Sequence, residues 1–206
     1  MTKEEIVFRD YFKKFNLSDP AVKKVFRTLQ SLFVKRGERF SHCNRVCKRA
    51  GFLVSGLLYA SYIDEEGKEI VSRFYYAPKN MIVSSFQSFQ DGKPANEYIE
   101  AIEDSYLLCI SRDDLAKLYR SIGILNFITR IIAEQSYVQA LQRIHFLQAL
   151  SNEQKIKEFL KDDSELVNKV KVQQLASYLG MHRNQFTRLL RKNNFATKSA
   201  SEGKQI

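Results

Sequence analysis

The sequence predicts an α+β protein with a β-rich N-terminal domain, a long helix and a C-terminal helix-turn-helix. Three observations support this fold class. Short runs rich in Val, Ile, Phe and Tyr alternate with turn residues between about Leu32 and Ser111. An apolar pattern of helical period then continues to about Leu150. Two short amphipathic patterns follow and meet at Gly180. We expect domains at residues 1–123 and 151–206, joined by a helix over 124–150.

The first segment, up to about Leu32, has the apolar spacing of helices. The break at Ser18-Asp19-Pro20 divides it in two. Pro20 fits the first turn of a second helix, which Ser18 or Asp19 can cap.

The middle of the first domain predicts short strands, because β-branched and aromatic residues recur between turn signals. This spacing is typical of a small barrel or sandwich. The expected strands lie within Leu32–Phe40, Arg45–Leu53, Leu57–Ile63, Ile70–Tyr76, Met81–Phe86 and Tyr98–Ile110.

The segment from Ser111 returns to helical periodicity. Ser111 can cap a short helix that ends near Gly123, and a long helix follows. The long helix is apolar on two sides. One side can cover the strands and the other can pair with a second subunit, although burial within one subunit is the alternative. We favour self-pairing, through the positions Ile124, Ile128, Ile131, Gln135 and Val138.

The helix-turn-helix pattern spans Val172–Lys192. Five apolar residues at helical spacing can share one small core: Leu175, Leu179, Met181, Phe186 and Leu189. Ala176 falls where the helices would cross, and Gly180 falls where the first helix must end. The outward residues include no acid, whereas a solvated face usually carries charges of both signs. The pattern therefore favours a DNA-binding unit over an ordinary helical hairpin.

Charge is concentrated in the same region. The chain carries a net charge of +10, which favours an anionic partner. From Lys169 to the C-terminus there are eight basic residues and one acid, Glu202. The predicted DNA-binding unit thus holds most of the excess positive charge.

Several features predict a cytoplasmic protein. The N-terminus is charged and lacks the apolar core of a signal peptide. The longest apolar tract, Ile122 to Ala133, is too short to span a bilayer and contains Arg130, so no membrane partner is expected. Three cysteines give no disulfide framework. No phosphate loop, nucleophile elbow or paired-His motif occurs, so we do not expect an enzyme.

Two long blocks of this sequence resemble the Crp/Fnr family of bacterial transcription regulators. The first domain carries FVKRGERF, GFLVSGLLYASYIDEEGKEIVSRFYY and EYIEAIEDSYLLCISRDDLAKLY, and the second carries KVQQLASYLGMHRNQFTRLLRK. The resemblance implies a jelly-roll-like β-roll of the cyclic-nucleotide-binding type as sensor, a dimerisation helix and a winged-helix-like DNA-binding domain. It implies a homodimer that binds double-stranded DNA and acts on RNA polymerase.

The resemblance also assigns roles on DNA. Arg183, Asn184 and Arg188 occupy the family's base-reading positions. Each arginine could pair with a guanine, whereas Asn184 stands where a Glu is common and prefers adenine. The family pattern and the helix N-terminus assign backbone contacts to Gln173, His182, Gln185 and Thr187. Arg191 and Lys192 either add such contacts or form a solvated helix end.

The implied effector pocket departs from the family pattern. The Gly-Glu pair that holds ribose aligns with Val83 and Ser84, and the Arg-Ser/Thr pair that holds phosphate aligns with Ala95 and Asn96. Lys93 lies close and could replace the arginine. Charge-assisted bonds to phosphate would be lost, so we expect no control by cyclic AMP in the standard way, and no cofactor. The segment from Ser84 to Asn96 binds another small molecule, or nothing.

Two further clusters and one rival function stay open. His42, Cys43 and Cys47 could form a metal or redox site, although we favour thiols packed on the β-roll. A basic tract is either a solvated turn, which we favour, or a surface that faces anionic material: Lys35, Arg36, Arg39, Arg45, Lys48 and Arg49. The rival to a DNA-binding regulator is a small-molecule-binding or interaction protein with a vestigial DNA-binding domain.

Overall fold

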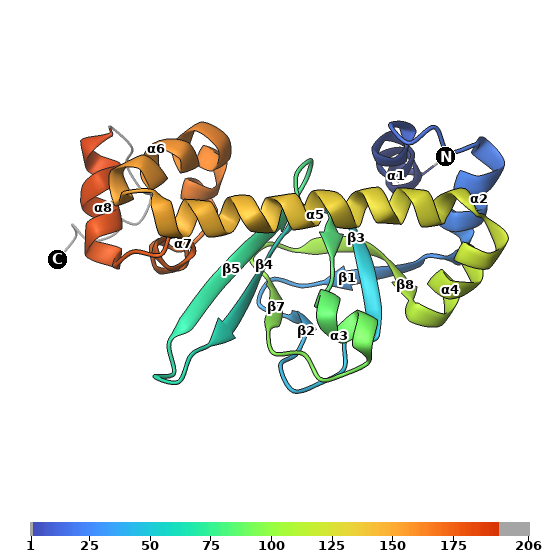
Figure 1. Cartoon of the computed structure of the whole chain (residues 1–206), viewed down its shortest axis with the longest axis horizontal. Coiled ribbons are helices and arrows are strands. Elements are labelled where there is room, and N and C mark those ends of the chain that lie inside the picture. The colour runs from blue at the N-terminus through green and yellow to red at the C-terminus, as the bar shows by residue number, and fades with distance from the viewer. Residues whose placement is uncertain (1, 194–206) are drawn as a thin grey trace. The chain divides into compact units, whose positions relative to one another are not determined.

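The computed structural model describes residues 2–193, and it divides into two compact units (Figure 1). The first unit comprises Met1–Tyr62 and Ser72–Gln135, and the second comprises Ile63–Val71 and Ser136–Ile206. Residues 194–206 lie outside the described residues.

The first unit begins with two helices, α1 (Lys3–Lys13) and α2 (Asp19–Thr28). The Thr2 side chain accepts from the backbone N–H of Glu5 and caps α1. Pro20 lies in the first turn of α2, where a missing backbone N–H costs nothing. The break predicted around Pro20 therefore separates two helices.

Two four-stranded sheets form the β-roll. The first contains, in spatial order, β1 (Gln30–Val34), β8 (Ser105–Ser111), β3 (Arg49–Ser55) and β6 (Ile82–Val83). The second contains β2 (Arg39–Ser41), β7 (Tyr98–Ala101), β4 (Leu57–Ile63) and β5 (Glu69–Tyr76). Non-consecutive strands are neighbours in both sheets, so local sequence does not determine the pairing.

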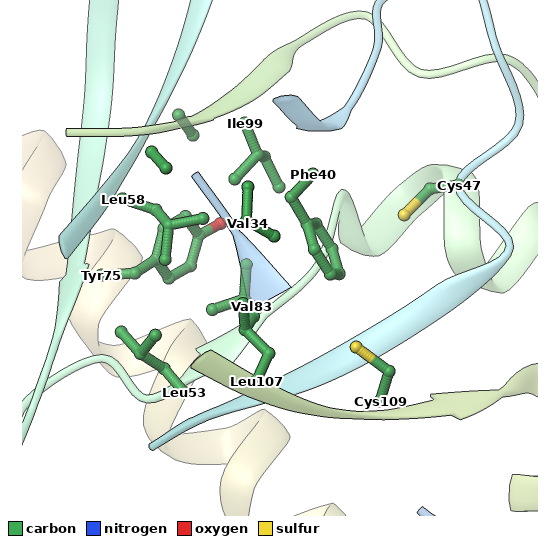
Figure 2. Close-up of a cluster of buried hydrophobic side chains, with 12 residues drawn as sticks. Val34, Phe40, Cys47, Leu53, Leu58, Tyr75, Val83, Ile99, Leu107 and Cys109 are labelled. Carbon is green, nitrogen blue, oxygen red and sulfur yellow. The ribbon is translucent and has the colours of Figure 1, made fainter. Parts of the chain in front are cut away.

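The interior of the roll is filled by side chains from both sheets (Figure 2). The cluster is almost wholly apolar and consists of Val34, Phe40, Cys47, Leu53, Leu58, Ala60, Tyr75, Val83, Ile99, Ala101, Leu107 and Cys109. Burial of this apolar surface is the main force that holds the two sheets together.

A second cluster contains residues of the two N-terminal helices, β3, β8 and two later helices, α4 (Arg112–Ser121) and α5 (Ile124–Ala149). The Phe8 ring packs edge-on against Phe52 with centroids 5.3 Å apart. Leu118 and Ile128 enter the same cluster. Side chains along β3 point alternately to its two faces, so β3 contributes to both clusters. Leu53 faces the roll interior, and Phe52 faces the helices.

Three expected strands differ from the structure. The run Met81–Phe86 yields only the short β6, after which α3 (Phe86–Asp91) forms and ends at Gly92 with φ +69°. The run Leu32–Phe40 is divided by a turn in which Gly37 has φ +82°. The run Tyr98–Ile110 is divided into β7 and β8. The helix α3 forms because Gln favours a helix and Gly92 can end it in a left-handed conformation. These preferences are stronger than the strand preference of the short apolar run before α3.

The second unit holds the rest of the helices (Figure 1). The long helix α5 has 26 residues, and its part from Ser136 onward belongs here. Then come α6 (Asn152–Asp163), which begins with a capping box formed by Ser151 and Gln154, and a 3₁₀ turn at Ser164–Asn168. None of the helices in the described residues is long and apolar enough to cross a membrane.

Candidate nucleic-acid interface

Two short helices near the C-terminus share one small core. They are α7 (Val172–Tyr178) and α8 (Arg183–Lys192). Leu175, Leu179 and Phe186 are fully buried. Leu189 and Leu190 are also buried, whereas Met181 is only half-buried. The apolar periodicity thus identified four of the five residues of this core and missed Leu190.

The turn between α7 and α8 is closed by two backbone hydrogen bonds. The N–H of Met181 donates to the carbonyl of Ala176, and that of Gly180 donates to the carbonyl of Ser177. This pair is a Schellman motif, and it requires the left-handed φ of +65° at Gly180. Ala176 itself is buried. The predicted roles of Gly180 and Ala176 therefore agree with the geometry.

The N-terminus of α8 is capped by a histidine. The Nδ1 atom of His182 accepts from the backbone N–H of Asn184 at 3.3 Å. Because Nδ1 accepts, the neutral ring carries its proton on Nε2. The His182 side chain is exposed, so its remaining N–H can serve an outside acceptor.

The three predicted base readers lie together on α8. Arg183, Asn184 and Arg188 are all exposed. Arg183 and Arg188 have no ion pair within the described residues. Both guanidinium groups are therefore available for a ligand outside the chain. A basic helix face of this kind matches the acceptor pattern of guanine in the major groove.

The residues predicted to contact the DNA backbone differ in their exposure and hydrogen bonding. Gln173, at the start of α7, and Arg191, on α8, are exposed. Gln185 and Thr187 are half-buried, and the Thr187 hydroxyl donates to the carbonyl of Arg183. Thr187 therefore presents lone pairs rather than its proton to the outside.

Lys192 is engaged within the chain. Its Nζ lies 2.8 Å from Oε1 of Glu153, on α6. Lys192 lowers the pKa of the Glu153 carboxyl, with smaller contributions from Lys157 and Arg188. A phosphate contact by Lys192 would thus compete with this exposed ion pair, which is weak in water.

The predicted effector residues differ in their exposure. Val83, Ser84 and Ala95 are buried, whereas Lys93 and Asn96 are exposed. Val83 is part of the interior cluster. The Tyr75 hydroxyl donates to the carbonyl of Ser84. The Ser84 hydroxyl is buried and has no hydrogen-bond partner among residues 2–193.

The cysteines do not gather with other ligand types. Cys43 is half-buried, and Cys47 and Cys109 are buried. Burial raises the pKa of the Cys109 thiol to about 11. Within residues 2–193, no group of three His, Cys, Asp or Glu side chains could hold a metal ion.

Comparison with solved structures shows which known fold this architecture has. Neither models of known protein families nor curated proteins match the sequence. FixK2 from Bradyrhizobium japonicum matches over 81% of this chain and 84% of its own, with a TM-score of 0.68 and 13% identity. A putative transcriptional regulator of the Crp/Fnr family from Eubacterium rectale matches over 90% and 88%, with a TM-score of 0.64 and 21% identity. The chain has the fold of the Crp/Fnr regulators.

A third structure shares this fold. The c-di-GMP responsive global regulator CLP from Xanthomonas campestris matches over 86% of this chain and 92% of its own, with a TM-score of 0.66 and 14% identity. The Crp/Fnr fold combines the β-roll and the helical second unit, as the sequence predicted. No strand of a wing occurs between Asn152 and Asn193.

One side of α5 carries large apolar side chains that are exposed to solvent. The large apolar side chains left exposed on this helix are Ile124, Phe127, Tyr137, Val138, Leu141, Ile144 and Leu147. Of the five positions expected to face a second subunit, Ile124, Gln135 and Val138 are exposed and Ile131 is half-buried. Ile128 is fully buried in the cluster with Phe52, so its assignment to the dimer face is wrong.

Three further polar residues connect elements of the second unit, and sequence reasoning missed them. The buried Lys155 ammonium donates to the carbonyl of Leu147, near the end of α5. The Arg143 guanidinium donates to the carbonyl of Tyr178 and lies over the Tyr178 ring. The Ser177 hydroxyl accepts from the N–H of Val71 and donates to the carbonyl of Glu69. No local sequence pattern marks these long-range contacts.

Proposed function

We propose that this protein is a homodimeric, sequence-specific DNA-binding transcription regulator. The observation that carries the proposal is the exposed, acid-free face of α8. Arg183, Asn184 and Arg188 are displayed there on a helix whose opposite side is fully buried. A rigid helix with unpaired guanidinium groups can read base edges in the major groove.

Phosphate contacts would fix the register of α8 on the duplex. The outward N–H of His182 and the exposed Gln173 and Arg191 lie on the same two helices. The N-terminus of α8 adds its unpaired backbone N–H groups. Gln185, Thr187 and Lys192 would contribute less, because they are half-buried or paired.

Pairing of two copies would occur through α5. Val138, Leu141 and Ile144 are about half exposed, and Val138 and Leu141 are three positions apart on one side of the helix. Exposed apolar side chains in such a row favour burial against a second helix. Two paired copies would present two α8 helices to a palindromic site. A regulator of this type would act on RNA polymerase.

The proposed regulator is not controlled by cyclic AMP in the standard way. Ala95 stands at the position implied for the phosphate-binding arginine, and it is buried. Lys93, which the sequence offers as a replacement for that charge, is exposed. An uncompensated cyclic phosphate would lose the charge-assisted bonds that normally hold it.

Selection of randomised duplex DNA by the purified full chain tests the proposal. The selection is run without nucleotide, at about 0.15 M salt, where non-specific binding is partly screened. Enrichment of a palindromic site, lost in the double variant Arg183→Ala/Arg188→Ala, would support a dimeric reader. A matched variant, Lys23→Ala/Lys24→Ala, removes two exposed cations from α2 and should enrich the same site. Failure of the unmodified chain to enrich any site would contradict the proposal as stated.

A further inference from the structure

A second basic surface lies in the first unit, outside the DNA-reading face. Three segments contribute to it: the loop Asn44–Arg49, the turn after α3 and the start of α4. We name it the loop patch, and it consists of the exposed residues Arg45, Lys48, Arg49, Lys93 and Arg112. Sequence alone grouped three of these with Lys35, Arg36 and Arg39, and it did not connect Lys93 or Arg112 with them.

Backbone hydrogen bonds and close contacts bring these segments together. The N–H of Asn44 donates to the carbonyl of Ala95, and the N–H of Ala95 donates to the carbonyl of Arg45. Val46 and Pro94 form an isolated bridge. On the other side, Gly92 lies against Arg112, whose Nη1 would be 3.3 Å from a Cβ at that glycine. Arg49 pairs in register with Ser111, the residue before Arg112.

The loop is held in one conformation from inside. The backbone N–H of Cys47 donates to the Ser88 hydroxyl, which in turn donates to the carbonyl of Lys93. Ser88 is buried, so one hydroxyl joins both loops. A surface fixed in this way loses little conformational entropy when it binds, which favours affinity.

The charges of the loop patch are not neutralised within the described residues. None of its five cations forms an ion pair there, whereas Arg39, earlier in the same basic tract, pairs with Glu100 at 3.1 Å. Two exposed acids, Asp91 and Asp113, lie next to the patch in sequence and do not pair with it. Like charges on neighbouring segments repel one another, and an anionic partner would relieve that repulsion.

We infer that the loop patch is a docking surface for an acidic protein surface that presents an apolar side chain at its centre. The position of Val46 favours a protein over a nucleic acid. Val46 is 40% exposed and contacts the exposed Pro94 between the cations. An apolar centre within a charged rim is the usual anatomy of a protein interface. The loops Asn44–Arg49 and Gly92–Pro94 contain no aromatic ring on which a base could stack.

The test uses the full chain and three labelled probes: poly-glutamate, the same polymer with one central leucine, and a random-sequence duplex of equal charge. Arg45→Glu/Lys48→Glu should weaken both acidic polymers about tenfold or more, because like charges across an interface repel strongly. The matched control Lys23→Glu/Lys24→Glu carries the same charge change on α2 and should weaken them less than about twofold. Circular dichroism melting verifies that each variant is folded.

A third variant distinguishes binding that uses an apolar contact from binding by charge attraction alone. The unmodified chain should bind the leucine-containing polymer more tightly than plain poly-glutamate, and Val46→Ser should remove that difference. Equal losses of affinity for the acidic polymers in the patch and control variants would overturn the inference. A larger loss for the duplex than for the acidic polymers would overturn it too, because the patch would then be a nucleic-acid surface. Both outcomes are independent of sequence-specific reading by α8.

Discussion

The Nζ atom of Lys155 lies 3.0 Å from the carbonyl oxygen of Leu147, so α6 supplies a hydrogen-bond donor to the C-terminal end of α5. The carbonyls of a last helical turn have no partner within the helix, and a cation there also interacts favourably with the helix dipole. Lys155 is buried, so its ammonium group has exchanged water for this carbonyl.

Lys155→Met should therefore lower the free energy of unfolding by about 1–3 kcal/mol, because the Leu147 carbonyl loses a charged donor. Urea unfolding followed by circular dichroism measures the change. Lys157→Met, at an exposed position two residues further along α6, is the control and should change stability by less than about 0.5 kcal/mol. Equal effects of the two substitutions would show that the hydrogen bond does not contribute.

Gly180→Ala should destabilise the second unit and weaken DNA binding. A Cβ at this position meets both a left-handed backbone, φ +65°, and Leu147 Cδ2 at 3.1 Å. The backbone alone costs about 1–2 kcal/mol. Gly67→Ala provides the comparison, because Gly67 has φ +78° with open space around its Cβ position. Thermal melting should show a larger loss for Gly180→Ala than for Gly67→Ala.

Base reading and phosphate binding should be separable on α8. Arg183→Ala should cost about 1–3 kcal/mol on the selected site and relax the base preference at one position. Arg191→Ala should weaken selected and random duplexes alike and reduce the salt slope by about one. Titrations at several salt concentrations measure both effects. Unchanged preference in Arg183→Ala would move base reading away from this residue.

The exposed side of α5 should control the oligomeric state. Leu141→Glu places a charge where an apolar contact is expected, so the protein should sediment as a monomer at concentrations at which the unmodified chain dimerises. Gln139→Glu introduces the same charge at an exposed polar position of α5, and it should leave the dimer intact. A Leu141→Glu dimer as tight as the original would exclude this helix as the interface.

The stability of the first unit should depend on pH above about 9 through Cys109. Burial raises the pKa of this thiol to about 11 from an ordinary value of 9.0. The unfolded chain therefore loses the proton first as pH rises, so the thiol's contribution to stability is full below pH 9 and declines towards pH 11. Urea unfolding of the unmodified chain and of Cys109→Ala should show a difference that shrinks across this range.

The helix-turn-helix could be predicted because its information is local. Leu175, Phe186 and Gly180 lie within a short stretch, and their spacing alone defines two helices and a turn. The β-roll was recognisable as many short strands, but the neighbours β1 and β8 are far apart in sequence. Their pairing depends on contacts that no periodicity records.

The partly wrong dimer face of α5 has a similar cause. Ile128 and Val138 have the same apolar character, and a helical repeat cannot say which one faces the chain's own core. Lys155 and Ser177 were missed for the related reason that their partners are set by the tertiary structure. The loop patch likewise exists only because folding brings Arg112 and Lys93 to the loop that carries Arg45.

The hydroxyl of Ser177 also covers part of an open strand edge. β5 lies at the outer edge of its sheet, where backbone groups are open to pairing with another chain. By binding the N–H of Val71 and the carbonyl of Glu69, Ser177 occupies one full hydrogen-bonding step of that edge. A helix side chain thus ends the sheet in the way that a further strand would, and it leaves that step closed to intermolecular strand pairing.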